Sequence, residues 1–292
     1  MPVTTFAPAK VNLYLHVTGR RPDGYHLLDS LVAFADIGDR VTAEPAEHLS
    51  LTMSGPEAGC LGSLGHDNIV LRAARLLACH FGIGAGAALH LEKNLPVAAG
   101  IGGGSSDAAA ALRALTELWK LRIDDATLRA LAARLGADVP ACVSGRAAWV
   151  AGIGEQVALA AALPKAGILL VNPRRELPTA SVFAARRGSF AEPGRFQAIV
   201  ADAEQLAQLL TSRRNDLTEA AIGLVPEIGV ILARLGALPE TLLARMSGSG
   251  ATCFALFRDR EAAARARTVI AAAEPSWWCT AGGFVAVDEL SR

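Results

Sequence analysis

The fold of this 292-residue chain depends most visibly on one stretch, Pro96-Val97-Ala98-Ala99-Gly100-Ile101-Gly102-Gly103-Gly104-Ser105-Ser106. Its glycines let backbone amides turn toward an anion and approach it closely, because glycine has no Cβ. Apolar residues then recur at helical spacing over 106–119, so a helix starts where the glycines end. The positive end of a helix also attracts anions. The stretch therefore predicts a phosphate-binding loop that leads into a helix, with a triphosphate as its ligand.

Two common phosphate loops do not match these residues. A Walker A loop ends in Gly-Lys-Ser or Gly-Lys-Thr, and no lysine follows the glycines here. A dinucleotide fingerprint needs Gly-x-Gly-x-x-Gly, whereas Gly100 and Gly102 are followed by Ser105. This disfavours a dehydrogenase. A plain flexible turn is the structural alternative, but three adjacent glycines, two serines and an amphipathic helix favour phosphate binding.

Residue periodicity places strands and helices on both sides of the loop. Residues 87–93 alternate like a strand and lead into the loop, and Asp67 or Asn68 caps an expected helix that ends at His80. Further strands are expected at 5–17, 31–42, 147–153, 167–171, 253–257 and 284–287, and further helices at 128–135, 201–212, 226–236 and 260–272. The chain length suits two domains with a boundary near residue 160.

The charge balance excludes some classes of partner. Lys plus Arg equals Asp plus Glu at 28 each, so no net field attracts nucleic acid or an anionic membrane. Any anionic ligand must be held by local geometry. The amino terminus lacks the pattern of an export signal, and no apolar run approaches the length of a membrane span. These features predict a cytoplasmic protein that does not bind membranes.

The cysteines indicate the redox environment. The sequence has no Cys-x-x-Cys pair and no histidine at the sequence spacing of a metal site, which predicts reduced, buried thiols and a cytoplasmic location. The five cysteines are Cys60, Cys79, Cys142, Cys253 and Cys279.

Two charged residues are candidates for catalysis, although each has a plain alternative. Lys10 lies among the small residues of Ala7-Pro8-Ala9-Lys10, which leave its ammonium group free to be enclosed, yet a lone strand lysine is more often solvated. Asp138 precedes Pro140, which suits the first turn of a helix, so Asp138 is alternatively a helix cap.

Two further segments leave alternatives open. Tyr25 and His26 follow Asp23-Gly24 in a turn, where an aromatic ring either folds back on the core or stacks on a ligand. The segment 246–252, Met-Ser-Gly-Ser-Gly-Ala-Thr, is either a tight connection or a second small-residue loop that brings backbone close to the phosphates.

Together the lysine strand, the loop and the late glycine-rich segment resemble the GHMP family of small-molecule kinases. Ile101 replaces the leucine usual in the family loop, and Ala98-Ala99 stand where glycine is frequent; isoleucine preserves the apolar contact. The resemblance implies an α+β, two-domain GHMP kinase fold. Residues 1–160 would form a ribosomal protein S5 domain 2-like N-terminal domain that binds ATP, and residues 161–292 a ferredoxin-like C-terminal domain.

Within the family, the chain is most similar to members that act on a cytidine diphosphate-linked methylerythritol. The ending Asp23-Gly24-Tyr25-His26, the triple glycine before Ser105 and the block 136–140 carry this similarity. The resemblance implies ATP-dependent phosphorylation of the 2-hydroxyl of that substrate, in the mevalonate-independent route to isoprenoids, with Mg²⁺ as cofactor.

The resemblance also implies roles for individual residues. Asp138 would be the general base and Lys10 its partner at the accepting hydroxyl. Residues 96–106 would hold the ATP phosphates, and the Ser105 and Ser106 hydroxyls are candidates for Mg²⁺. The substrate-binding residues would be Asn12 near the methylerythritol, Tyr25 and Phe183 on either face of the cytosine, and His26 at its edge; Phe183 is inferred from Pro173 and Thr179 upstream.

Two alternatives remain at this level. One is another kinase of the family, acting on homoserine, mevalonate or a sugar. The other is a nucleotide-binding regulator that has lost catalysis, against which the presence of both Lys10 and Asp138 argues.

Overall fold

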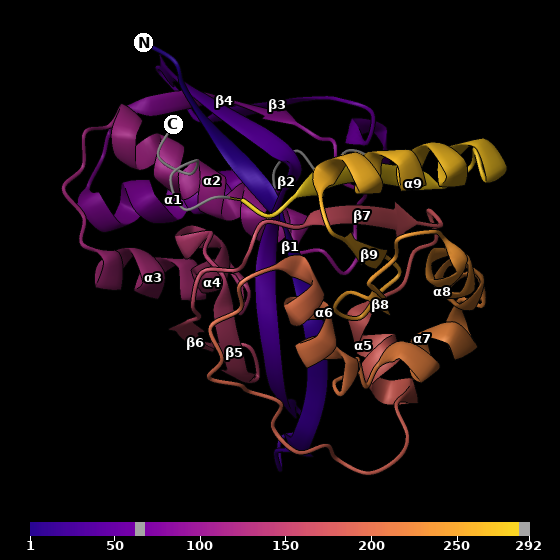
Figure 1. The fold of residues 1–292 in the computed structure, drawn as a ribbon. Helices are drawn as coiled ribbons and strands as arrows, with labels where there is room; N and C mark the ends of the chain where they lie inside the picture. Colours follow the sequence, from indigo (N-terminus) through magenta and orange to yellow (C-terminus); the bar gives the residue numbers. More distant parts are fainter. Residues whose placement is uncertain (62–67, 286–292) are drawn as a thin grey trace.

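The computed structural model describes residues 1–61 and 68–285, which form two β-sheets covered by helices (Figure 1). The first sheet has the order β3-β4-β2-β5-β6, with β1 paired to β2. Among the described strands of this sheet, only β3 and β4 pair in parallel. Its strands are β1 (Val3–Arg20), β2 (His26–Ala46), β3 (Ser50–Ser54), β4 (Gly86–Glu92), β5 (Ala148–Gly152) and β6 (Gln156–Leu159).

Strands β1 and β2 form a long antiparallel ribbon that runs the height of the molecule in Figure 1. Both are longer than the predicted strands 5–17 and 31–42, because their pairing continues to Arg20 and His26 beside the connecting turn. The face of β1 that carries Lys10 and Asn12 is buried as well. Residues from both halves of the chain cover that face, so a simple alternation of buried and exposed residues does not apply.

Four helices pack with the first sheet around one apolar cluster. Asn68 caps α1 by accepting a hydrogen bond from Val70 N, as predicted. The buried alanines of α2, among them Ala108 and Ala111, allow close packing on the sheet because their side chains are small. The helices are α1 (Ile69–Phe81), α2 (Gly103–Leu118), α3 (Asp125–Ala133) and α4 (Val139–Ser144), and a short 3₁₀ helix, η1, covers Ala58–Leu61.

The second sheet is antiparallel with the order β10-β7-β9-β8. Helices follow β7 and β9, which gives the β-α-β-β-α-β succession of a ferredoxin-like unit. The predicted α+β class and ferredoxin-like C-terminal part are therefore confirmed. The elements are β7 (Gly167–Asn172), α5 (Thr179–Ala185), α6 (Ala203–Thr211), α7 (Thr218–Leu224), α8 (Glu227–Ala237), β8 (Leu243–Met246), β9 (Cys253–Phe257), α9 (Arg260–Ala273) and β10 (Trp278–Gly283).

The last predicted strand is misplaced. The structure has a strand at Trp278–Gly283, and Phe284 makes only an isolated bridge to Ala35. The apolar run 284–287 suggested a strand on local grounds, but the edge of β7 pairs with the earlier segment. Residues 286–287 lie outside the described residues.

The two sheets share an apolar cluster. Leu13 and Leu31 of the β1–β2 ribbon pack with Ile168, Leu170 and Phe254 of the second sheet. The strands of the first sheet lie within 3–159 and those of the second within 167–283. A domain boundary at residue 160 stays a prediction. No helix among the described residues is both long and apolar enough to cross a membrane.

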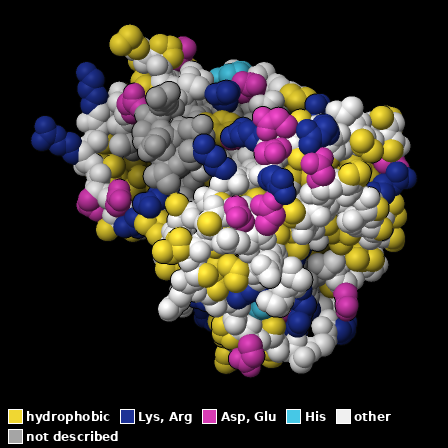
Figure 2. All heavy atoms as spheres, in the orientation of Figure 1, with side chains coloured by type: hydrophobic (Ala, Val, Ile, Leu, Met, Phe, Trp, Pro, Cys, Tyr) yellow, Lys and Arg dark blue, Asp and Glu magenta, His cyan; other side chains and the backbone are white. Residues whose placement is uncertain are grey.

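The outer surface reflects the balanced composition. Figure 2 shows Lys and Arg side chains interspersed with Asp and Glu over the face in view, without a broad region of one sign. On this face, electrostatic attraction of a large polyanion has no extended patch to act through.

The described cysteines are unpaired but not uniformly buried. Cys142 and Cys253 are buried, whereas Cys279 is half-buried and Cys79 is exposed. The prediction of buried thiols is therefore wrong for Cys79, which lies on the solvent side of α1. The side chain of Cys60 lies outside the described residues.

These differences predict selective thiol labelling. Burial raises the pKa of the Cys142 thiol to about 11, and burial also raises the pKa of Cys253. Because the thiolate is the reactive form, iodoacetamide at pH 8 is expected to modify Cys79 well before Cys142. Peptide mass mapping over time checks this, with urea-unfolded protein as the control. Equal labelling rates for these two cysteines in folded protein would contradict it.

Candidate active site

The phosphate loop predicted at 96–106 is shorter in the structure. Helix α2 begins at Gly103, so the last four residues of the motif form its first turn. Gly100 and Gly102 adopt positive φ angles of 73° and 63°, a region that favours glycine. The loop therefore turns sharply into the amino terminus of a 16-residue helix, whose first amides have no partner within the helix.

The loop lies directly against β1. The backbone N–H of Lys10 donates to the Ile101 carbonyl at 2.9 Å. A Cβ at Gly102 would lie 3.1 Å from the Cβ of Lys10, so glycine permits this close approach. The Lys10 side chain is thereby placed beside the loop.

Lys10 and Asp138 form an ion pair. Lys10 Nζ lies 2.8 Å from Asp138 Oδ1, and their side chains are 7% and 42% exposed. Asp138 directly precedes α4 but makes no side-chain cap hydrogen bond. The alternative interpretation of a solvated lysine is therefore wrong. Asp138 is the N-cap residue of α4, but its side chain contacts Lys10 instead of capping the helix.

The late small-residue segment 247–252 packs on the phosphate loop. Ser247 Oγ donates to the Gly100 carbonyl at 3.0 Å, and the Thr252 N–H donates to the Ala99 carbonyl at 3.1 Å. A Cβ at Gly100 would lie 2.5 Å from the Gly250 carbonyl oxygen. Of the two alternatives for this segment, the structure supports the one that brings it to the loop.

These elements surround a cavity of about 590 Å³, a size typical of small-molecule sites. Both halves of the chain contribute to its wall. Lining residues that were predicted for the site are Lys10, Asn12, Pro96, Val97, Ala98, Ala99, Gly100, Gly102, Gly103, Gly104, Ser105, Asp138 and Phe183.

Two residues of the predicted loop do not line this cavity. Ile101 is fully buried in the shared apolar cluster. Ser106 is also buried, and its hydroxyl donates to the Pro8 carbonyl at 2.7 Å and contacts Cys142 Sγ. The expectation that Ser106 binds a metal is therefore wrong, since its side chain faces the interior.

The three predicted cytosine-binding residues are only partly together. Phe183 of α5 lines the cavity, and the His26 ring stacks on it with centroids 5.1 Å apart. Tyr25 is 61% exposed in the turn between β1 and β2 and is not part of the cavity wall. Partial burial, with Arg20 and Arg186 nearby, lowers the pKa of His26, which favours the neutral form of its ring.

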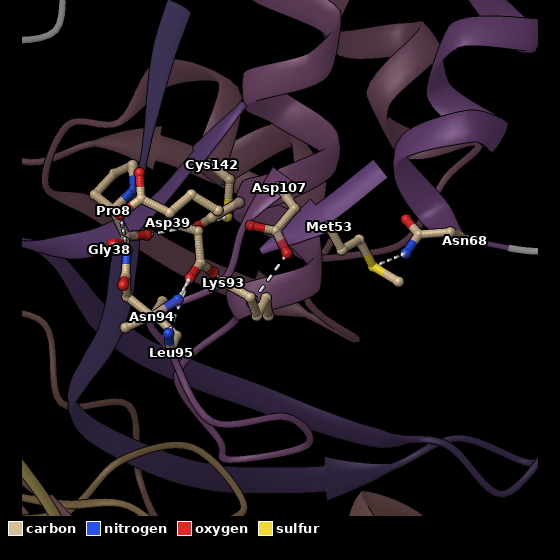
Figure 3. A network of polar contacts seen from close by, with 12 residues as sticks. Pro8, Gly38, Asp39, Met53, Asn68, Lys93, Asn94, Leu95, Asp107 and Cys142 are labelled. Atoms are coloured by element: carbon tan, nitrogen blue, oxygen red, sulfur yellow. Dashed lines mark hydrogen bonds and ion pairs between the residues drawn. The ribbon is translucent and has the colours of Figure 1, made fainter. Parts of the chain in front are cut away.

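Sequence reasoning missed a buried cluster beside the loop, which consists of Asp39, Lys93 and Asp107 (Figure 3). Lys93 Nζ contacts Asp39 and lies 3.0 Å from Asp107 Oδ2. Asp39 Oδ1 also accepts hydrogen bonds from the amides of Asn94 and Leu95, which lead into the loop. One signal was available: Asp107 interrupts an alanine-rich, buried face of α2.

Known proteins of similar sequence are kinases of the GHMP family, which is consistent with the geometry of this site. Family models described as the GHMP kinase N-terminal domain and the GHMP kinase C-terminal part match residues 68–146 and 196–275. A 4-diphosphocytidyl-2-C-methyl-D-erythritol kinase of Cereibacter sphaeroides is 55% identical over 276 residues, which cover 94% of this chain and 96% of the relative. The kinase of that name from Rhodospirillum rubrum is 53% identical and covers 96% of this chain and 91% of the relative.

Solved structures extend the comparison. A crystal structure of 4-(cytidine 5'-diphospho)-2C-methyl-D-erythritol kinase is 36% identical, with a TM-score of 0.80 over 97% of this chain and 99% of the other. A homoserine kinase from Cytophaga hutchinsonii has a TM-score of 0.70 at 17% identity, over 97% of this chain and 94% of the other, which shows the shared fold alone. With both family models matched and relatives of nearly equal length more than half identical, this chain belongs to the GHMP kinase family.

Proposed function

We propose that this chain is a 4-(cytidine 5'-diphospho)-2-C-methyl-D-erythritol kinase, which transfers the γ-phosphoryl group of ATP to the 2-hydroxyl of its substrate. This reaction belongs to the mevalonate-independent route to isoprenoids. The observation that carries the proposal is the 2.8 Å contact between Lys10 Nζ and Asp138 Oδ1, in a cavity that the phosphate loop also lines. Relatives with that activity are more than half identical over nearly the whole chain.

The donor half of the reaction depends on the loop and α2. In phosphoryl transfer, the enzyme mainly positions the reactants and balances the charge on the moving group. The unpartnered amides at the start of α2 and the positive end of its dipole would hold the phosphates. Gly103 and Gly104 leave room for this, because they place no side chain between phosphate and backbone.

The acceptor half depends on Asp138 and Lys10. An alcohol is a weak nucleophile, so Asp138 would accept the proton of the 2-hydroxyl as its oxygen attacks the γ-phosphorus. Lys10 holds the carboxylate in place and would steady the negative charge that develops on the attacking oxygen. The backbone N–H of Lys10 donates to the loop at the Ile101 carbonyl, a contact that would keep the acceptor hydroxyl aligned with the phosphates.

We also propose Mg²⁺ as the cofactor. Among the described residues, the cavity wall has the cations Lys10 and Lys93 and the anions Asp107 and Asp138. These side chains balance one another, so the charge of the triphosphate needs a cation from outside the protein. The Ser105 hydroxyl lines the cavity and would help to hold Mg²⁺, which would offset the negative charge of the phosphates when bound.

Substrate selection would involve Phe183, from the second half of the chain, together with residues of the β1–β2 ribbon. Phe183 presents an aromatic face for cytosine, with His26 and Tyr25 as partners in the same region of the ribbon. Asn12 lines the cavity, and its Oδ1 has no hydrogen-bond partner among the described residues. This oxygen is available to a hydroxyl of the methylerythritol.

Replacement of the stacking ring tests this assignment. Phe183→Ala is expected to raise KM for the cytidyl substrate about ten- to hundredfold, because base stacking on an aromatic ring is lost. The Kd for ATP should change little. Steady-state kinetics and calorimetric titration measure the two effects. Phe190→Ala is the matched control, since this ring is half-exposed and outside the cavity wall; an unchanged KM in Phe183→Ala would contradict the assignment.

A substrate panel tests the function itself. The purified protein, with ATP and Mg²⁺, is expected to release ADP with the cytidyl substrate and to yield its 2-phosphate, identified by mass spectrometry. Activity on homoserine, mevalonate or a sugar and none on the cytidyl compound would assign another GHMP kinase activity. ATP binding without ADP release for every acceptor would indicate a non-catalytic regulator.

Two statements on organisation accompany this proposal. The separation of the two sheets near residue 160 supports an ATP-binding domain at 1–160 and a carboxy-terminal domain at 161–292. The dependence on ATP supports a cytoplasmic location.

A further inference from the structure

Asp107 has a buried carboxylate that is only half satisfied. Its side chain is 4% exposed, and Oδ2 pairs with Lys93 Nζ at 3.0 Å. The second oxygen, Oδ1, is buried and has no hydrogen-bond partner among the described residues. Buried polar atoms are nearly always partnered, so this oxygen calls for an explanation.

The charge of the surrounding cluster is also unbalanced. Lys93, Asp39 and Asp107 have side chains that are 3%, 0% and 4% exposed, so two carboxylates share one ammonium group away from water. A second cation beside Asp107 would therefore lower the electrostatic energy of the cluster.

The position of Asp107 indicates which cation would bind beside it. Asp107 lies four residues after Gly103, on the same face of α2, and helical side chains lean toward the helix amino terminus. Lys93 Nζ, which contacts Asp107, is also 3.2 Å from the place of a Cβ at Gly103. Asp107, Gly103 and Gly104 line the same cavity. The carboxylate thus lies at the level of the turn where the phosphates would bind.

We propose that Asp107 Oδ1 binds the Mg²⁺ ion that accompanies ATP, an inference that rests on the proposed function. Mg²⁺ at nucleotide sites is held by one or two carboxylates together with phosphate oxygens and water, so one carboxylate suffices. The described residues contain no cluster of three or more His, Cys, Asp or Glu side chains that forms a complete metal cage. The ion is therefore bound with the nucleotide rather than before it. Lys93 holds Oδ2 and leaves Oδ1 as the single ligand atom.

Nucleotide titrations with and without metal test this role. With wild-type protein, Mg²⁺ is expected to strengthen binding of a non-hydrolysable ATP analogue by at least about tenfold in isothermal titration calorimetry. In Asp107→Asn most of this gain should disappear, while metal-free binding is retained. The amide keeps the shape of the side chain and an oxygen for Lys93. Asp125→Asn is the matched control, because it removes an equal charge from an 89% exposed site on α3.

The outcomes separate the hypotheses. If Asp107→Asn retains the full Mg²⁺ gain, Asp107 is not a ligand. If wild-type protein does not bind the analogue at all, the proposed function has failed instead.

A measurement without a variant at Asp107 covers the case in which Asp107→Asn does not fold. Mn²⁺ replaces Mg²⁺ in protein labelled with ¹³C-aspartate and saturated with the analogue. Electron-nuclear double resonance is expected to detect a carboxylate carbon beside the metal, and the same signal should persist in Asp138→Asn. The absence of this coupling in wild-type protein, or its loss in Asp138→Asn, would overturn the proposal.

Discussion

Asp138→Asn is expected to lower kcat by about a thousandfold while the Kd for ATP stays nearly constant, because the amide cannot accept the proton of the 2-hydroxyl. Asparagine has nearly the same shape and still offers an oxygen to Lys10, 2.8 Å away in the native ion pair. The amino terminus of α4 and the phosphate loop remain in place. The change therefore removes the base without removing the site.

Single-turnover kinetics with saturating ATP measure this effect apart from product release, and calorimetry measures ATP binding. Asp125→Asn is the control for a lost negative charge, since Asp125 lies exposed on α3 and pairs only weakly with Arg129 at 3.8 Å. Turnover near the wild-type rate in Asp138→Asn would remove Asp138 from the base role and leave Lys10 with positioning alone.

Gly100→Ala is the second change with a large expected effect, because two loops meet at this glycine. An added Cβ would lie 2.5 Å from the Gly250 carbonyl oxygen and 2.7 Å from that of Ser247. Gly100 also has a φ of 73°, which is strained for alanine. The loops must separate, which is expected to lower Tm by about 5 °C or more and to weaken ATP binding by about tenfold or more.

Differential scanning fluorimetry and nucleotide titration check these two effects. Gly84→Ala is the matched control, since a Cβ there has no heavy atom within 4 Å and the residue is exposed. Its Tm and ATP affinity should stay close to the wild-type values. Wild-type ATP affinity in Gly100→Ala would show that contact between the two loops does not organise the phosphate site.

Elements with a strong local pattern were predictable. The strand at 253–257 matches β9, and the helix predicted at 260–272 matches α9 to within one residue at its end. The predicted capping role of Asn68 is also confirmed. In each case the signal lies within the element itself, as a run of apolar residues or a capping side chain next to an amphipathic stretch.

Short or partner-dependent elements were missed. β6 and β8 have four residues each, and α5 and α7 have seven each, too few for a clear period. The real last strand, β10, contains Gly282 and Gly283 and forms because the edge of β7 is available to it. Edge pairing is a property of the partner strand, so a local pattern does not reveal it.

The phosphate loop shows what the sequence by itself determined. Gly100 and Gly102, with positive φ, turn the chain into a helix amino terminus through local backbone geometry alone, and the resemblance to GHMP kinases followed from such motifs. The comparisons confirm that family. Because α2 starts at Gly103, the loop ends four residues earlier than predicted.

Only the tertiary structure decided how the charged residues combine. Lys10 and Asp138 meet because β1 and the start of α4 pack beside the loop. Asp107 meets Lys93 because α2 packs on β1 and β2, next to the segment that follows β4. Burial then removes water as a competing partner, so a contact with Asp138 replaces solvation of Lys10. One oxygen of Asp107 is left without a hydrogen-bond partner in the described part of the chain. Neither partner choice nor burial is a property of the local sequence, because both arise from residues that folding brings together.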